Sequence, residues 1–203
     1  MAASTPTSTP TRDRIIDAAM TLFGDNGFRG TSVAQIEAAA GLTPGAGGLY
    51  HHFRSKEEVL TAGIDRHLDR LSALRDIRRL FTDLGDTRAE LTMTARYALT
   101  ELDSETELLR ILATEARTRP ALVERAVSAL VNTTHAEFSA WLQESKCCPP
   151  ERAAAISAVG LGALLSNRLT RGLLGIAPAG VDDTTFISTW VEMISNLIDP
   201  RRA

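Results

Sequence analysis

The sequence predicts an all-α protein with about nine helices. Apolar residues recur every three or four positions along most of the 203-residue chain, which is the spacing of one helix face. No stretch reads as a strand, because no segment alternates apolar and polar residues over a strand's length. Glycine, proline and capping residues interrupt the periodic stretches where helices would end.

The first helix should begin at Thr11. Residues 1–10 are mostly Ser, Thr and Pro, and such a tail has too few apolar side chains to fold. Helical spacing continues through Phe23. Gly27 predicts the helix end, because glycine suits the left-handed C′ position, and Phe28 can then fold back on the last turn.

Two short helices should follow. Ser32 and Gln35 have the spacing of a capping box, in which each side chain satisfies a backbone donor of the other residue. Thr43 followed by Pro44 is the N-cap and N1 pattern of a third helix, which we expect to reach Phe53. This segment contains three glycines, each costing a helix about 1 kcal/mol relative to alanine, so packing must stabilise it.

A long fourth helix should begin after Ser55, with Glu57 and Glu58 in the first turn, where the helix dipole favours anions. Apolar positions recur through Leu84, a length of roughly 43 Å. The later periodic stretches predict five further helices, over residues 87–102, 104–118, 120–145, 151–171 and 182–198.

The three short helices form a helix-turn-helix pattern, because a tight turn at Gly41 separates the second from the third. The last helix of such a motif can lie in the major groove of DNA. The alternative is a plain three-helix corner, and the pattern alone does not separate the two.

A series of motifs along the first sixty residues favours the DNA-binding alternative. The motifs are Ile15-Ile16-Asp17-Ala18-Ala19, Leu22-Phe23, Gly27-Phe28, Thr31-Ser32-Val33, Ile36, Ala39-Ala40-Gly41, Leu49-Tyr50-His51-His52-Phe53 and Ser55-Lys56-Glu57-Glu58-Val59-Leu60. Over about residues 12–62 the chain resembles the amino-terminal domain of TetR-family transcriptional regulators.

The resemblance implies a domain organisation and a function. Residues 1–10 would be a disordered tail, residues 11–60 a helix-turn-helix head, and residues 61–203 a ligand-binding and dimerisation body joined to the head by the long helix. Most family members are repressors that a ligand releases from DNA. We therefore expect a homodimer that binds an inverted-repeat operator.

The resemblance also implies DNA contacts. Ser32, Tyr50 and Lys56 should contact phosphates, and His51 a base or phosphate; Gln35 can pair with an adenine edge. The expected contact residues are Ser32, Gln35, Thr43, Pro44, Gly45, Ala46, Gly47, Tyr50, His51, His52 and Lys56. Alternatively, Ser32 and Gln35 do no more than cap their helix, and Lys56 is simply solvated.

One departure from the family lies between the turn glycine and the tyrosine. The family usually has six residues there, whereas Leu42 to Leu49 is eight. The extra residues must lengthen the turn or the front of the third helix.

The last two helices should supply the dimer interface. Residues 151–171 are rich in small side chains, which permit close helix approach, and residues 182–198 have an apolar arc too wide for one buried stripe. The expected interface residues are Val159, Gly162, Leu165, Phe186, Trp190, Met193 and Leu197. The alternative is that both are core helices.

A small-molecule effector should bind among the middle helices. The candidate pocket residues are Phe81, Tyr97, Leu112, Phe138, Trp141 and Leu165. Mostly apolar walls predict an apolar effector, although these side chains can equally belong to the core.

Other function classes find little support. The histidines and cysteines lack the spacing of metal ligands, and the chain has no paired Glu-x-x-His motif, so we expect no metal, no cofactor and no enzyme. A structural DNA-associated or division-related protein of the same fold remains an alternative. With no apolar run of 18 residues and no signal-like start, a cytoplasmic location is expected.

The charge is informative only by segment. The chain carries a formal net charge of −3, and residues 1–60 hold five basic against six acidic side chains. We expect DNA binding to have a shallow salt dependence, since few phosphates would be neutralised per head.

Overall fold

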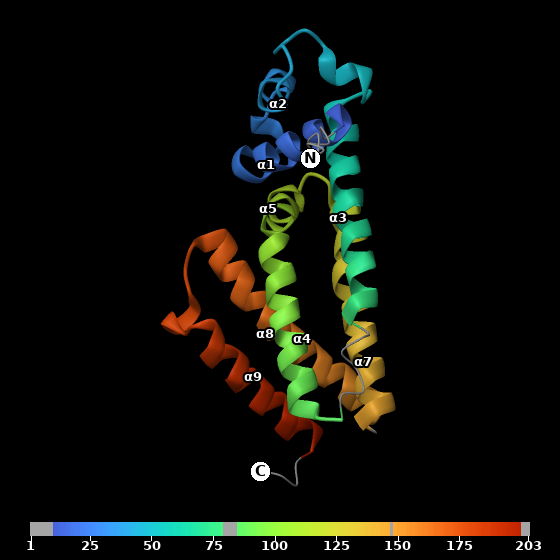
Figure 1. The fold of residues 1–203 in the computed structure, drawn as a ribbon, viewed down its shortest axis with the longest axis vertical. Helices are drawn as coiled ribbons and strands as arrows, with labels where there is room; N and C mark the ends of the chain where they lie inside the picture. Colours follow the sequence, from blue (N-terminus) through green and yellow to red (C-terminus); the bar gives the residue numbers. More distant parts are fainter. Residues whose placement is uncertain (1–9, 79–84, 147, 200–203) are drawn as a thin grey trace, which may run out of the picture.

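The computed structural model describes residues 10–78, 85–146 and 148–199, and every regular element in these ranges is a helix. The molecule is elongated, with α2 (Val33–Ala39) near one end and the carboxyl end of α9 (Asp183–Ile198) near the other (Figure 1). Residues 1–9 of the expected tail and the expected end of the long helix, including Phe81 and Leu84, lie outside the described residues.

The amino-terminal head contains α1 (Thr11–Gly30), α2 and the short 3-10 helix η1 (Gly48–His51). The predicted capping box before α2 is confirmed. Ser32 Oγ accepts a hydrogen bond from the Gln35 N–H at 3.3 Å, and Gln35 Oε1 accepts one from the Ser32 N–H at 2.7 Å. Each residue thus satisfies a donor that the helix start leaves free.

The prediction of a third α-helix from Thr43 is wrong. Turns occupy residues 44–47, and η1 forms a single 3-10 turn after them. The reason is that Gly45 and Gly47 have positive φ angles of 75° and 78°, which no right-handed helix contains. Leu49 and Phe53 face inward as predicted and are buried.

Gly27 ends the regular part of α1 in a conformation that differs from the expected one. Its φ of 72° is positive, as predicted, but its ψ is 162°. That combination lies outside the left-handed helical region, in a region essentially restricted to glycine. The chain then turns back so that the Phe28 and Phe23 rings lie 5.2 Å apart.

Replacing Gly27 with asparagine is expected to lower the free energy of unfolding by about 1–3 kcal/mol, as measured by urea denaturation. The cost is backbone strain, because a Cβ at this position would meet no atom within 4 Å. Gly175 is the matched control: its Cβ would also be free, but its φ of 67° and ψ of 15° are left-handed helical, which asparagine tolerates. Equal losses for Gly27→Asn and Gly175→Asn would contradict this explanation.

The long helix and six further α-helices build the rest of the described molecule. Glu58 N–H donates to Ser55 Oγ at 3.1 Å at the start of the long helix. The helices are α3 (Lys56–Arg78), α4 (Thr87–Ser104), α5 (Thr106–Glu115), α6 (Pro120–Val127), α7 (Thr133–Lys146), α8 (Pro150–Leu174) and α9 (Asp183–Ile198). A π-helical turn, η3 (Ser128–Asn132), divides the expected single helix 120–145 into α6 and α7.

Two hydrophobic cores hold these helices. The first joins the head to α5 and α6, through buried side chains such as Phe23, Leu108 and Ala126. The second lies in the body and packs α4, α7, α8 and α9 around Phe138 and Trp190. The head therefore shares its core with two body helices. Because α5 packs directly against α1, a displacement of α5 would also displace α1.

Helix α8 is long and apolar enough over Pro150–Gly172 to cross a membrane by length and composition. In this fold it packs against α4, α7 and α9. Its apolar residues Ile156, Leu161 and Leu164 belong to the body core. These contacts explain its composition as that of a core helix.

Candidate nucleic-acid interface

The predicted DNA-contacting residues gather at the α2 end of the molecule (Figure 1). The turn residues Thr43, Pro44, Gly45 and Ala46 are exposed, and Gly47 is half-buried. The exposed side chains directly after this turn are those of Tyr50, His51 and His52. Hydrogen-bond donors and an aromatic ring are thus exposed at one end of the molecule. The buried side chains of Leu49 and Phe53 hold this segment against the core of the head.

The capping box restricts what Gln35 can offer. Gln35 Oε1 accepts from both the backbone N–H and the hydroxyl of Ser32, at 2.7 and 2.9 Å. The amide N–H₂ group is left as the donor for other contacts. A bidentate contact with adenine needs both the oxygen and the nitrogen, so Gln35 would have to release the cap to make it.

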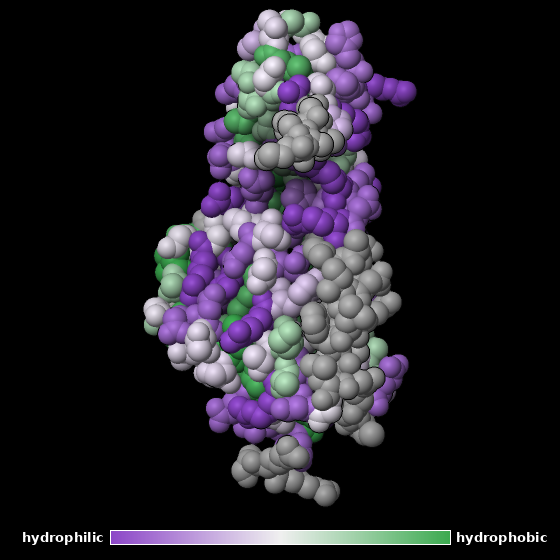
Figure 2. All heavy atoms as spheres, in the orientation of Figure 1, coloured by the Kyte–Doolittle hydropathy of each residue, from purple (hydrophilic) through white to green (hydrophobic). Residues whose placement is uncertain are grey.

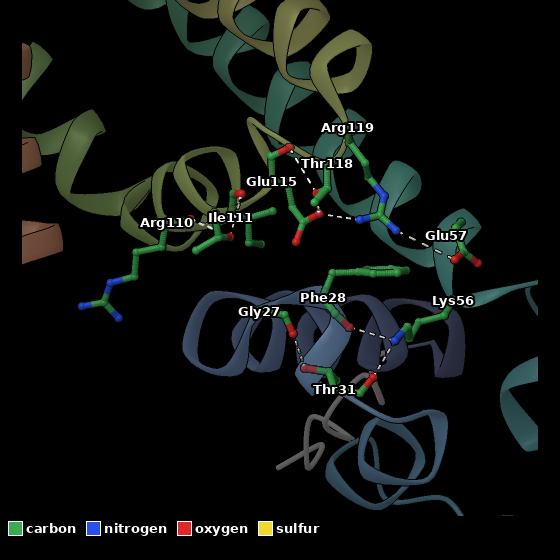
Figure 3. A network of polar contacts seen from close by, with 11 residues as sticks. Gly27, Phe28, Thr31, Lys56, Glu57, Arg110, Ile111, Glu115, Thr118 and Arg119 are labelled. Atoms are coloured by element: carbon green, nitrogen blue, oxygen red, sulfur yellow. Dashed lines mark hydrogen bonds and ion pairs between the residues drawn. The ribbon is translucent and has the colours of Figure 1, made fainter.

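Lys56 is tied to the loop before α2 (Figure 3). Its Nζ donates to the carbonyl oxygens of Phe28 at 2.8 Å and Thr31 at 2.7 Å, and it lies 4.2 Å from the centre of the Phe28 ring. An ammonium group has three donors, so one remains for a phosphate. Lys56 is therefore not the freely solvated side chain of the alternative interpretation.

A network of body residues meets the same loop from the other side (Figure 3). The Arg119 guanidinium lies 3.8 Å from the centre of the Phe28 ring and pairs with the buried Glu115 carboxylate. Burial acts to raise the pKa of Glu115, but hydrogen bonds from Thr118 and Arg119 outweigh it and lower the pKa. Glu115 therefore stays ionised next to the head. The sequence offered no sign of this network.

Glu37 is a second residue that the sequence analysis missed. Its side chain is fully buried, and its carboxylate accepts hydrogen bonds from the N–H groups of Gly45 at 2.7 Å and Leu49 at 3.1 Å. A signal was present, because Glu37 lies on the helix face of Ile36 and Ala40, where an apolar residue would be expected. An acid at such a position needs a buried partner.

The amino-terminal head matches a family model. The model described as "Bacterial regulatory proteins, tetR family" matches residues 15–62. Residues 15–62 are therefore similar to the DNA-binding domain of this family. The matched residues run from α1 across the capping box and the glycine turn into α3. They include all eleven predicted DNA-contact residues.

Curated HTH-type transcriptional regulators are similar over the same region. The HTH-type transcriptional regulator UidR of Escherichia coli strain K12 is 42% identical over 64 residues, which is 32% of each chain. The HTH-type transcriptional repressor KstR2 of Rhodococcus jostii is 32% identical over 106 residues, 52% of this chain and 50% of that protein. The similarity thus spans about one third to one half of these relatives.

Solved structures resemble nearly the whole chain in fold. The fatty acid degradation regulator FadR of Bacillus halodurans has a TM-score of 0.64 at 17% identity, over 97% of this chain and 98% of that one. AibR, solved with isovaleryl coenzyme A and operator DNA, has a TM-score of 0.61 at 24% identity, over 91% and 97%. The body therefore shares the fold of these solved regulators.

The residues predicted for the dimer interface lie at different depths in the body. Val159 is 55% exposed, and a Cβ at Gly162 would meet no atom within 4 Å. Met193 and Leu197 are half-buried against the body core, and Phe186 and Leu165 are half-buried as well. Trp190 is a correction: it is 2% exposed and its indole N–H donates to the Gly160 carbonyl at 2.7 Å, so it belongs to the body core.

The predicted pocket residues that the structure describes belong to different parts of the fold. Leu112 packs in the first core with the head, because α5 turns its apolar face toward α1, whereas Phe138 and Trp141 stack in the body core with ring centres 5.4 Å apart. Tyr97 and Leu165 are half-buried, and Phe81 lies outside the described residues. Leu112 is therefore removed from the candidate pocket.

Two surface grooves lie at the head instead. One of about 410 Å³ is lined by α1 and the end of α2, and one of about 420 Å³ by α1, α3 and the α4–α5 junction. None of the five predicted pocket residues that the structure describes lines either groove. Within the described residues, no group of three His, Cys, Asp or Glu side chains is placed to hold a metal ion.

A buried carboxylate joins α3 to the α4–α5 junction. Glu105 is 3% exposed and accepts from His67 Nδ1 at 2.6 Å and from Arg70. Burial raises the pKa of the neighbouring Glu101, which Arg70 opposes. This cluster connects the long helix to the helix that packs on the head.

Proposed function

We propose that this protein is a sequence-specific DNA-binding transcriptional regulator, acting as a homodimeric repressor that a small ligand releases from an inverted-repeat operator. The observation that carries the proposal is the exposed turn and η1 segment at the end of a TetR-type head. Curated relatives of this domain are transcriptional regulators and repressors. Such a protein acts in the cytoplasm, where bacterial DNA lies.

The head would bind by positioned contacts rather than by bulk charge. Ser32 lies at the start of α2, where backbone N–H groups and the helix dipole favour a phosphate. Tyr50, another predicted contact, is 57% exposed, and the side chains of His51 and His52, which follow it in the chain, are exposed as well. Residues 43–47, whose glycines lack side chains, would let the backbone approach the duplex closely.

Dimerisation would use the outward face of α8 together with α9. The exposed positions Ala155, Ala158, Val159 and Ser166 and the half-buried Gly162 recur at helical spacing, and all are small or medium-sized. Leu174 and Ile176, just after α8, are 67% and 59% exposed. Hydrophobic side chains also reach the surface at the edge of the body where the segment between α8 and α9 lies (Figures 1 and 2). Contact between two copies of the chain about a two-fold axis would bury these groups and would place two heads on one operator.

The ligand would act through the shared core. Thr21 on α1 donates to Glu107 on α5 at 3.0 Å, and Phe23 and Leu108 pack in the same cluster. A ligand that displaces α5 would therefore move the head, which changes the spacing of two heads in a dimer. Similar folds were solved with isovaleryl and stearoyl coenzyme A, so acyl-CoA thioesters are the first effectors to test.

The test is footprinting of the full chain on DNA upstream of its own and neighbouring genes. We expect protection of an inverted repeat at nanomolar protein and a shallow dependence of affinity on salt. Release by acyl-CoA thioesters, with free coenzyme A as the control, would support the ligand proposal. Binding without sequence preference would contradict repression, and a steep salt dependence would contradict the positioned-contact mode.

A matched pair of arginine variants locates the interface. Arg54 follows η1 at the predicted DNA end, and Arg88 lies at the start of α4 near the other end of the molecule; both are exposed. Arg54→Gln is expected to weaken operator binding several-fold and to reduce the salt slope by about 1. Arg88→Gln removes the same charge and should leave both unchanged. Equal effects would place the interface elsewhere.

A further inference from the structure

The eight-residue segment from Leu42 to Leu49 is held at several points by one residue of α2. The backbone carbonyl of Glu37 accepts from the Leu42 N–H at 2.8 Å. Its side-chain oxygens accept from the Gly45 N–H at 2.7 Å and the Leu49 N–H at 3.1 Å. The start, the middle and the end of the segment are thus all tied to Glu37.

The segment has few other means of holding its shape. Gly45 and Gly47 have positive φ angles, and a Cβ at Gly45 would meet no atom within 4 Å. Its internal backbone hydrogen bonds are turn bonds such as that from the Ala46 N–H to the Thr43 carbonyl at 3.2 Å. Glycine-rich, exposed backbone loses much conformational entropy on ordering, so external bonds decide whether it is ordered.

The carboxylate replaces an N-cap. Thr43 would have capped the predicted third helix, but the helix does not form there. Glu37 instead meets the free N–H of Leu49 near the start of η1 from the protein interior, where its side chain is fully buried. Because its two side-chain oxygens accept from two different backbone N–H groups, this one side chain fixes two points of the segment.

We propose that Glu37 is the positioning residue of the DNA-contacting segment: its buried carboxylate orders the lengthened glycine turn so that Tyr50, His51 and His52 meet the operator in one arrangement. This inference rests on the proposed function. It assigns a role to an acidic residue near a polyanion, where simple electrostatics predicts that the acid should weaken binding. Ordering of the turn by Glu37 should therefore raise operator affinity, whereas the negative charge of an acid near DNA should lower it.

The test is Glu37→Gln in the full chain. The amide keeps the size of the side chain, but its N–H₂ group would face a backbone N–H, so one hydrogen bond is lost. We expect operator affinity to fall by about tenfold or more, and affinity for random-sequence DNA to stay equal or rise. Hydrogen exchange at the Gly45 and Leu49 amides should accelerate, while exchange at buried Phe23 in α1 should not.

Glu58→Gln is the matched control. Glu58 is an exposed carboxylate of the same head that accepts from the Arg54 N–H at 2.5 Å, so its variant removes the same charge and also a backbone contact, but outside the turn. Operator preference should survive in this variant. The pair separates loss of turn order from loss of negative charge.

If Glu37→Gln does not fold, Glu37→Asp tests the role of Glu37. It keeps the charge but is one methylene shorter, so the Gly45 or Leu49 amide should lose protection in a folded protein. The proposal is overturned if folded variants keep both amides protected, or if operator and random-sequence affinity fall together with global stability. Absence of any operator preference in the unsubstituted protein would instead count against the proposed function, and the amide exchange would still decide the role of Glu37.

Discussion

Replacing Phe28 with alanine is expected to lower the free energy of unfolding by about 3–5 kcal/mol, the range for truncating a buried aromatic side chain. Phe28 is 4% exposed and packs against Phe23 in the first core. Its ring also lies between two cations, Lys56 at 4.2 Å and Arg119 at 3.8 Å from the ring centre. Truncation would leave a cavity where head and body meet.

The cation contacts can be separated from the lost volume. Phe28→Leu keeps most of the apolar burial and removes the aromatic face. In a double-mutant cycle with Arg119→Met, urea denaturation should give a coupling energy of about 1 kcal/mol between ring and guanidinium. The cycle is needed because Arg119 also pairs with Glu115, which the single variant disrupts. A coupling energy near zero would show that Phe28 acts by volume alone.

Replacing Arg168 with methionine is expected to destabilise the body by about 2–4 kcal/mol, measured by the same method. Arg168 is 6% exposed, and its guanidinium bonds Asp183 through two nitrogens at 3.0 and 2.6 Å and Asp103 at 2.8 Å. It thereby ties α8 to the start of α9 and the end of α4. The two carboxylates are partly exposed and can regain water, so the loss stays below that of a fully buried pair.

The effect should depend on pH with a defined sign. Hydrogen bonding from Arg168 lowers the pKa of Asp183, partly opposed by burial. A carboxyl whose pKa is lower in the folded state stabilises the fold above its unfolded pKa, about 3.9, and loses that contribution as the pH falls toward its folded pKa. The stability difference between the native protein and Arg168→Met should therefore be largest near neutral pH and shrink below about pH 4.

Arg66→Met is the control for this pair. Arg66 pairs with Asp17 on the surface, where both side chains are more than one third exposed. Its loss should cost less than about 1 kcal/mol. A cost for Arg168→Met as small as that of the surface pair would show that the α4, α8 and α9 contacts rest on apolar packing alone.

Features that depend on neighbouring residues could be predicted from the sequence. The capping box of Ser32 and Gln35, the positive φ of Gly27 and the inward positions of Leu49 and Phe53 follow from contacts within a few residues. Helical periodicity likewise located α4, α8 and α9 to within a few residues. The same reasoning failed at Thr43, where helix signals competed with three glycines and the glycines prevailed.

The sequence by itself determined the all-helical class, the order of the helices and the TetR-type head, because caps, glycines and apolar spacing act over one or two helical turns. Tertiary structure alone decided that α5 packs on α1, that Arg119 covers Phe28 and that Trp190 faces its own core. It also decided that Glu37 holds the glycine turn. Such partners are chosen by the packing of whole helices, which the spacing of residues along the chain does not encode.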